Sequence, residues 1–488
     1  MGDRNLSRFV WPGFFGLLAL GWLALVVTAL LNYPGNGFLF LLFVASYTLM
    51  AGLALPKPRL YGYTFLAAFL FLGFCAKSAA YLSLGIPLVE PTGAFDGSGH
   101  AWDSALAPAI AGSGAVIVIR LLHLINFRNQ PKAASPLGLP PPAWYVRFRF
   151  PVLGASIAGL VALDVLNFFL ALFQVGVAPG VILPAHLSAV VEWLFVAGLA
   201  MWAATVVGWE AHLSPARLGS ILLIPLTEAF GSISTLSRSW YLFRATSYLL
   251  VAAEFPAFLR AHLARPWRAF FLVGLPVAFG VYLAGVSVLR IAVYPANYEL
   301  PTSSNAPVLP EHGQITNAKL QIAARELSLL AVGRWIGIEG TMAVSSYPGV
   351  STHFFESALR EKPSIGEFAL YQRLAGSYRT TNGFVFLTTP GAIAILDFSG
   401  SLPLVVVGMG LLTAVLIVFE IGTSRLLGNA FTVSIVAMSV ANAIAQMQFP
   451  YLFVVFLIEQ AVAVAGLALI SRVVSRRRDA RAPRPLST

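Results

Sequence analysis

The sequence predicts an all-α, polytopic membrane protein, and three observations carry that prediction. Of its 488 residues, 58% are hydrophobic and only 10% are charged, whereas about a quarter of the residues of soluble globular domains are charged. Mean hydropathy is +0.79. Runs of about 20 apolar residues recur along the chain, and each is long enough to cross a hydrocarbon core of roughly 30 Å.

The apolar runs define about twelve transmembrane helices. They are expected at residues 10–32, 37–55, 62–86, 105–126, 151–174, 187–209, 218–234, 241–258, 269–292, 402–420, 427–446 and 450–471. The seventh and eighth helices are separated by a segment that contains Arg238 and Arg244. Because charged residues are costly in a bilayer core, a hinge or a pair of half-helices is expected there.

One long polar segment, residues 292–398, interrupts the apolar pattern and is called the insert below. The predicted domains are residues 1–291, a transmembrane block of about nine helices; 292–398, a loop domain; 399–471, a block of about three helices; and 472–488, a basic tail. Helices are expected in the insert at 317–338, 351–360 and 364–378, the last with Ser364 and Glu367 as a capping box. The loop domain is therefore predicted to be mostly helical.

Positively charged residues determine the expected orientation. Alternate short loops contain Lys or Arg, whereas the loops at 33–36, 88–104, 175–186 and 447–449 contain neither. Because cytoplasmic loops are enriched in these residues, both termini are predicted to be cytoplasmic and the insert periplasmic, in a bacterial inner membrane. The net charge of +11 is then explained by membrane lipids as partners. Since no basic surface with interleaved aromatics is present, nucleic acid is not expected to bind.

Metal and cofactor signatures are missing from the sequence. Cys75 is the single cysteine and lies in an apolar run, so no disulfide or thiolate site is expected. No P-loop and no HExxH pattern occurs. Asp96, His100 and Asp103 lie close together in one loop, but their spacing matches no familiar metal site. We therefore expect no metal, no cofactor and no ATP-driven transport.

The most function-like segment is Gly333–Gly340, in which a cation, an aromatic residue and a carboxylate alternate with glycines. Arg334 offers a planar fork suited to two phosphate oxygens. Glu339 is a candidate base or partner of a sugar hydroxyl, and Trp335 is a candidate substrate contact. The alternative interpretation is an Arg–Glu pair that pins the loop to the membrane, with Trp335 as an interfacial anchor.

Three further residues of the insert are candidates. His353 could accept a proton from an attacking hydroxyl, because its unperturbed pKa lies near neutral pH. Arg373 and Arg379 lie six residues apart and could bind a diphosphate. Solvation of His353, and pairing of the two cations with Glu367, are the structural alternatives.

Ionisable residues inside the predicted helices also require an explanation, since one ion at mid-membrane costs roughly 2.5–3.5 kcal/mol. We expect Lys77 and Arg120 to pair with Asp164 or Glu228 as structural contacts. Glu192 and His186 are predicted to face one outward cavity. Arg238 and Arg244 are predicted to lie at the mouth of the seventh helix, where they could contribute to substrate binding. The remaining candidates are His123 and Glu254.

Several short patches resemble the O-antigen (Wzy-type) polymerases, a family of oligosaccharide repeat-unit polymerases of bacterial inner membranes. The patches are Asn167-Phe168-Phe169 through Val177, Leu183-Pro184-Ala185-His186-Leu187, Glu192-Trp193, Gly333 through Gly340, and Pro390-Gly391-Ala392 to Ser401. The order of a long helical block, a large late periplasmic loop and a short helical block is also similar.

The resemblance implies a membrane glycosyltransferase of GT-C-like architecture that polymerises undecaprenyl-diphosphate-linked oligosaccharide units of O-antigen or exopolysaccharide. It implies that Arg334 and Arg379, with Arg373, Arg238 and Arg244, bind the lipid diphosphate. His353 or Glu339 would then be the base that activates the attacking hydroxyl. A flippase and a chain-length regulator are the partners that this reaction implies.

Three other functions remain open. An O-antigen ligase would use the same chemistry, and a lipid-linked sugar or polysaccharide transporter or flippase would use the charges inside the helices. A structural subunit of a polysaccharide or secretion complex would use the insert for docking. An enzyme is favoured, because polar residues concentrate in the insert and no internal repeat typical of transporters is visible.

Overall fold

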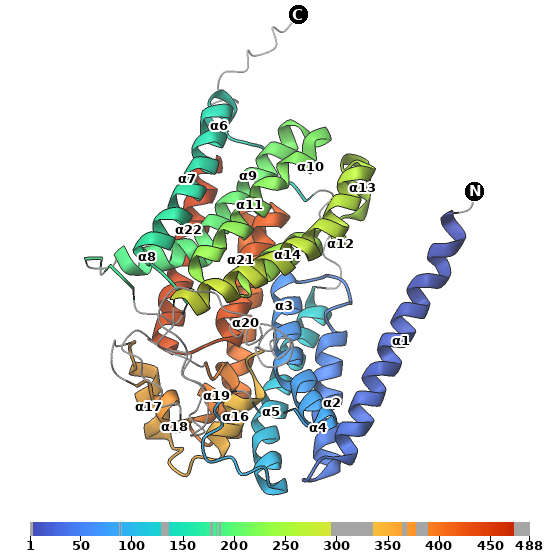
Figure 1. Ribbon diagram of the computed structural model, residues 1–488, viewed down its shortest axis with the longest axis vertical. Coiled ribbons are helices and arrows are strands. Elements are labelled where there is room, and N and C mark those ends of the chain that lie inside the picture. Colours follow the sequence, from blue (N-terminus) through green and yellow to red (C-terminus); the bar gives the residue numbers. More distant parts are fainter. Residues whose placement is uncertain are drawn as a thin grey trace, which may run out of the picture.

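A computed structural model of the chain describes residues 3–86, 88, 90–127, 136–175, 179–181, 183–184, 187–293, 335–363, 368–376 and 389–472. Every regular element in these ranges is a helix, which confirms the predicted all-helical class (Figure 1). The apolar composition of the long helices is that of a polytopic membrane protein.

The first half of the chain forms the elements α1 to α14. They are α1 (Asp3–Leu31), α2 (Gly37–Gly52), α3 (Tyr61–Leu70), η1 (Phe71–Ala76), α4 (Lys77–Leu84), α5 (Gly99–Asn126), α6 (Ala143–Arg147), α7 (Arg149–Leu170), α8 (Leu187–Trp193), η2 (Leu194–Gly198), α9 (Leu199–Leu213), η3 (Pro215–Arg217), α10 (Leu218–Ile221), α11 (Leu223–Gly231), η4 (Ser232–Thr235), α12 (Trp240–Glu254), α13 (Pro256–His262) and α14 (Arg265–Val293). The later elements are α16 (Ile338–Ser345), α17 (Thr352–Arg360), α18 (Leu370–Leu374), α19 (Ala392–Asp397), α20 (Leu402–Leu427), α21 (Ala430–Ala445) and α22 (Pro450–Arg472).

Eight continuous helical segments of the described chain are long and apolar enough to cross a membrane. They are Tyr61–Leu84, Gly99–Asn126, Arg149–Leu170, Leu187–Leu213, Pro215–Thr235, Arg265–Arg290, Leu402–Leu427 and Pro450–Ser471. Shorter apolar helices cover Gly16–Leu31, Gly37–Gly52 and Ala430–Ala445. Eleven of the twelve predicted segments coincide with these helices, and the remaining one, 241–258, coincides with α12 and the start of α13. The number that cross the bilayer stays a prediction.

The hinge expected near Arg238 and Arg244 lies elsewhere. Helices α12 and α13 meet at an angle of 97° and could form a ninth span as a bent pair. The bend falls at Phe255–Pro256. Proline has no backbone N–H to continue the helical hydrogen bonding and its ring crowds the preceding turn, which explains why the break occurs at this point.

Helix α21 lies at the centre of the molecule and is buried along almost its whole length. It packs against α3, α9, α12 and α20. Its N-cap, Asn429, accepts hydrogen bonds from Phe431 and Thr432 N–H and donates to the carbonyl oxygen of Ala204 in α9. A side chain at Gly208 would overlap the Asn429 amide, so this glycine permits the cap to bridge two helices.

Figure 1 shows the early helices α1–α5 and the middle helices α6–α14 as two groups, with the C-terminal helices between them. Contacts agree, because α20 packs on α5 and α21 joins α3 to α9 and α12. The helices of the insert gather at one end of the first group. There α16 packs on α5, and α19 packs on α16 and α20.

Glycines bring the insert into contact with the apolar helices. A side chain at Gly73, midway along Tyr61–Leu84, would overlap the carbonyl oxygen of Ile336. Gly337 meets the backbone of Gly73 in the same way. Because the two backbones approach without intervening side chains, this part of the insert reaches the middle of a membrane-length helix.

The helices predicted within the insert had mixed outcomes. Helix α17 confirms the prediction for 351–360, and the Ser351 side chain caps it by accepting from Phe354 N–H. The predicted helix 364–378 is wrong in extent, because α18 covers only Leu370–Leu374 among the described residues, and Gly376 takes a positive φ of 71° directly after it. Residues 317–334 and the expected capping box at 364–367 lie outside the described residues.

We expect Gly73→Ala to destabilise the protein by about 1–3 kcal/mol, because the added methyl group must displace the backbone at Ile336. Gly114→Ala in α5 is the matched control. Its new methyl group meets open space, so it should leave stability unchanged or raise it by up to about 1 kcal/mol. Apparent Tm values in one detergent measure both variants. Equal Tm values for the two would contradict close docking at Gly73.

Candidate functional site

A buried ion pair joins the insert to the apolar helices. Lys77 Nζ lies 2.5 Å from Glu339 Oε1 and donates a hydrogen bond of 2.7 Å to the carbonyl oxygen of Trp335. Tyr81, one turn further along α4, donates to Glu339 Oε1 at 2.6 Å. Lys77 and Glu339 are only 1% and 2% exposed. The pair therefore fixes residues 335–339 against α4.

The local backbone explains how this contact forms. Lys77 directly follows the π-helical turn η1, in which Lys77 N–H bonds to Leu72 O, five residues back. The turn inserts one extra residue into the helix, and it places Gly73 against Ile336 and Lys77 against Trp335. Sequence reasoning expected Lys77 to pair with Asp164 or Glu228, which is wrong. The true partner is 262 positions away along the chain, and no local pattern reveals it.

The position of Glu339 bears on its expected role. Its carboxylate is enclosed and engaged by a cation and a phenol, so its contacts here hold the segment in place. This arrangement resembles the structural alternative, in which a carboxylate pins the loop, except that the cation is Lys77. Its catalytic role stays a prediction.

Of the other ionisable candidates of the insert, only His353 and Arg373 are described. Arg334 and Arg379 lie outside the described residues. His353 is exposed on α17, and no hydrogen bond or ion pair between described residues joins it to Glu339. Arg373 is exposed on α18, and its Nε donates to the carbonyl oxygen of Phe368 at 3.1 Å.

A carboxylate that sequence reasoning missed lies at the end of α19. Asp397 is 7% exposed, and burial alone raises the pKa of its carboxyl to about 7. A carboxyl poised near neutral pH can either accept or donate a proton. The signal in the sequence was a single acid in an apolar run between Gly391 and Gly400. In the structure both glycines adopt positive φ.

A second carboxyl of the insert is held more firmly. Glu361 Oε1 accepts the backbone N–H of Leu370 at 2.6 Å and so ties the end of α17 to the start of α18. Burial raises the pKa of Glu361, while this hydrogen bond and the nearby Arg373 charge act in the opposite direction. Its role is therefore to connect two short helices.

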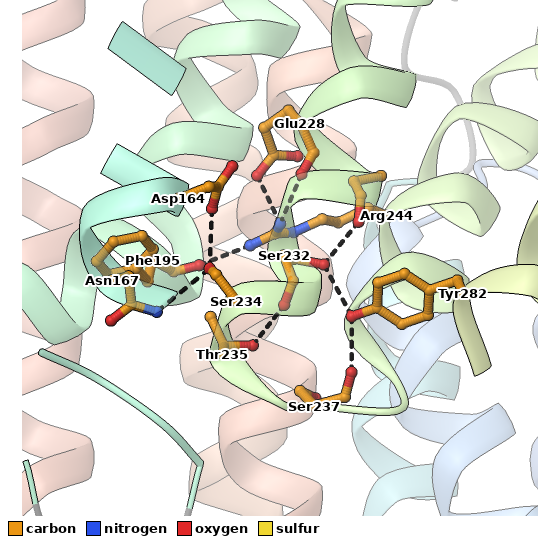
Figure 2. A network of polar contacts seen from close by, with 11 residues as sticks. Asp164, Asn167, Phe195, Glu228, Ser232, Ser234, Thr235, Ser237, Arg244 and Tyr282 are labelled. Carbon is orange, nitrogen blue, oxygen red and sulfur yellow. Dashed lines mark hydrogen bonds and ion pairs between the residues drawn. The ribbon is translucent and has the colours of Figure 1, made fainter. Parts of the chain in front are cut away.

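A second polar cluster lies among α7, α11, α12 and the turn η4 (Figure 2). Arg244 and Glu228 form an ion pair with Nη1 2.6 Å from Oε1, and each side chain is 2% exposed. Arg244 Nη2 donates to the carbonyl oxygen of Phe195 at 2.6 Å. Asp164 Oδ1 accepts from Ser234 Oγ at 3.0 Å. Two carboxyls and one guanidinium thus share one buried region.

Hydrogen bonds extend this cluster on both sides. Asn167 Nδ2 donates to Ser234 Oγ at 3.2 Å and to the carbonyl oxygen of Phe173 at 2.9 Å. On the other side, Tyr282 and Ser232 hydroxyls lie 3.0 Å apart, and the Tyr282 hydroxyl donates to Ser237 O at 2.6 Å. The cluster therefore links α7, η4 and α14.

The arginines inside the helices occupy other positions than the sequence predicts. Arg244 does not lie at an open mouth, because Glu228 and two carbonyl oxygens enclose it. No carboxylate of the described residues forms an ion pair with Arg120. It donates to the carbonyl oxygens of Leu53, Pro56 and Pro58. Arg238 is half-buried between η4 and α12.

Glu192 is exposed on α8 and lies near enough to Glu459 of α22 for the two charges to interact. His186, with which it was expected to share a cavity, lies outside the described residues. The binding role predicted for Glu192 therefore stays a prediction.

The acidic residues at the start of α5 and in the loop before it make structural contacts. Both carboxylate oxygens of Asp103 accept the N–H of Asn36, and one also accepts the Tyr33 hydroxyl. Asp96 accepts the N–H of Ser98. In the described part of the chain, no three His, Cys, Asp or Glu residues are grouped as metal ligands.

Comparison with known proteins gives no relative: no family model, no curated protein and no solved structure matches the chain. The function of the protein must therefore be inferred from its own residues.

Replacing Lys77 with Met should destabilise the protein by roughly 3–5 kcal/mol, because Glu339 would remain buried without its cation. The double variant Lys77→Met/Glu339→Gln should recover much of this loss, since no uncompensated charge remains. Apparent Tm values of the wild type, Lys77→Met, Glu339→Gln and the double variant give the coupling. Lys362→Met, which changes an exposed lysine that stacks on Tyr451, should cost at most about 1 kcal/mol. Additive losses in the double variant would disprove the pair.

Asp397→Asn should remove a pH dependence of stability. The carboxyl has a pKa of about 7 when folded and about 3.9 when unfolded, so the folded state binds more protons between these values. Wild-type stability should therefore fall as pH rises from about 4 to about 7 and then level off. Tm measured from pH 4 to 8 should show a smaller fall for Asp397→Asn. Asp96→Asn, which changes a fully exposed acid, should keep the wild-type profile. Identical dependence of Tm on pH for Asp397→Asn and wild type would refute a raised pKa at Asp397.

Proposed function

We propose that this protein transfers glycosyl groups between lipid-linked oligosaccharides and thereby polymerises undecaprenyl-diphosphate-linked repeat units of O-antigen or exopolysaccharide. The observation that carries the proposal is the attachment of Trp335 to Lys77. It holds the residue that directly follows Arg334 against the second half of the membrane-length helix Tyr61–Leu84. A cation placed there would meet the diphosphate of a lipid whose tail occupies the bilayer.

The proposal assigns the insert to the periplasm and both termini to the cytoplasm. Its support is the distribution of Lys and Arg among the short loops. A periplasmic enzyme has no sugar nucleotide available, so the activated donor would be the lipid-linked chain itself. Donor and acceptor carry the same kind of lipid, so both substrates would be anchored in the membrane beside the protein.

In the proposed reaction a hydroxyl of the incoming unit attacks the anomeric carbon of the growing chain. The new glycosidic bond forms, the bond to the lipid diphosphate breaks, and the hydroxyl proton passes to a base. Arg334, Arg379 and Arg373 would stabilise the negative charge on the departing diphosphate. The candidate bases are the imidazole of His353 and the carboxyl of Asp397, whose pKa is raised by burial to about 7.

Transport of a lipid-linked sugar is the second candidate function. A specific observation favours it, since the charge of Arg244, which is paired with Glu228, also acts on Asp164 among membrane-length helices. Transporters concentrate such carboxyls in their spans. A ligase would use the same chemistry as the polymerase with a different acceptor.

Arg334→Ala and Arg379→Ala should each abolish polymer while membrane insertion stays normal, because the leaving diphosphate loses a cation. Gel analysis of cell-surface glycan measures chain length. Arg360→Ala is the matched control, since Arg360 is an exposed cation of the same insert, and it should retain polymer.

The location of unpolymerised lipid-linked units separates the candidate functions. A polymerase defect leaves single units on the periplasmic leaflet, whereas a flippase defect leaves them on the cytoplasmic leaflet. Full-length polymer in both arginine variants would refute the proposal.

A further inference from the structure

The cluster in Figure 2 has an excess of acidic groups. The charges that act on Asp164 and Glu228 are those of Arg244 and of the two carboxyls themselves. The neighbouring titratable groups are Tyr248 of α12 and Tyr282 of α14, whose hydroxyls are neutral at ordinary pH. Full ionisation would therefore leave one uncompensated negative charge.

The Arg149 guanidinium does not compensate this excess, because it belongs to a separate ion pair. Glu210, at the far end of α9, is engaged by Arg149 and by the Tyr145 hydroxyl. An uncompensated charge among apolar helices is costly, and a carboxyl avoids the cost by binding a proton. One of the two acids in the cluster should therefore be neutral.

Geometry identifies which one. Glu228 contacts the guanidinium directly, with Oε1 2.6 Å from Arg244 Nη1, and this contact favours its ionised form. Asp164 has Ser234, not Arg244, as its hydrogen-bond donor. It lies on α7, which has few buried residues, so lipid would surround much of its helix.

The hydrogen-bond directions leave a defined place for the proton. Asn167 donates to Ser234 Oγ, so the single hydroxyl hydrogen of Ser234 is directed to Asp164 Oδ1. Oδ1 is thus an acceptor, and Oδ2 is free to carry hydrogen. Oδ2 lies against Gly231, where any side chain would overlap it.

We propose that Asp164 is a proton-binding site inside the helical bundle, with the proton on Oδ2 while Glu228 and Arg244 form their ion pair. Release of this proton would place a negative charge beside η4 and the lipid-facing helix α7. Reversible protonation would then alter the packing of α7 on α11 and η4. This property is independent of the proposed glycosyl transfer and serves either candidate function.

Infrared spectroscopy of the purified full-length protein, in a detergent without ester groups, tests the site. The carbonyl stretch of a protonated carboxylic acid is separate from carboxylate bands and shifts in D2O. At pH 7 the wild-type spectrum minus that of Asp164→Asn should contain the band of one protonated carboxyl. Glu210→Gln, a buried carboxylate with its own cation, should give no such band.

Ser234→Ala distinguishes Asp164 from Glu228 as the carrier. Loss of the donated hydrogen bond should raise the frequency of the Asp164 carbonyl stretch, whereas a proton on Glu228 would leave the band unmoved. The Ser234→Ala protein also provides the test if Asp164→Asn fails to fold. A difference spectrum between wild type and Asp164→Asn that contains no protonated band, or a difference band that does not move in Ser234→Ala, would overturn the proposal.

Discussion

Every cation buried in an apolar bundle must be neutralised or solvated by the chain itself, and this requirement organises the described structure. Lys77 is paired with Glu339, Arg244 with Glu228, and Arg149 with Glu210. The Arg120 guanidinium is instead solvated by three carbonyl oxygens of the segment 53–58. Because breaking a buried pair costs far more than an exposed one, each contact fixes which distant segments must meet.

Two π-helical turns make these contacts possible. In η2 the N–H of Leu199 bonds to Leu194 O, five residues back, so the carbonyl oxygen of Phe195 loses the partner that an α-helix would provide. Arg244 supplies the replacement hydrogen bond. In η1 the same irregularity precedes Lys77. Such turns often mark functional sites, and here each one admits a cation into the bundle.

The sequence predicted the helical class and the positions of the apolar helices well, because runs of apolar residues report directly on burial in lipid. It also predicted α17, whose Ser351 cap is a local signal. The charge partners were not predictable. Lys77 and Glu339 are brought together by a π-turn and two facing glycines, and neither feature has a local sequence signature. The bend at Pro256 was not predicted, because the expected break was placed at charged residues, although proline disrupts a helix more strongly than a charged residue does.

Paired charges and unbalanced acids serve different purposes. Once Lys77, Arg120, Arg149 and Arg244 are assigned to structural contacts, several carboxyls of the described chain are left without an ion-pair partner, and two of them bear on function. They are Asp397 in the insert and Asp164 in the helices. Since neither holds a cation, neither carboxylate contributes an ion pair to the packing of its helix. An acid in apolar surroundings that holds no cation is better suited to proton exchange than to stabilising the fold.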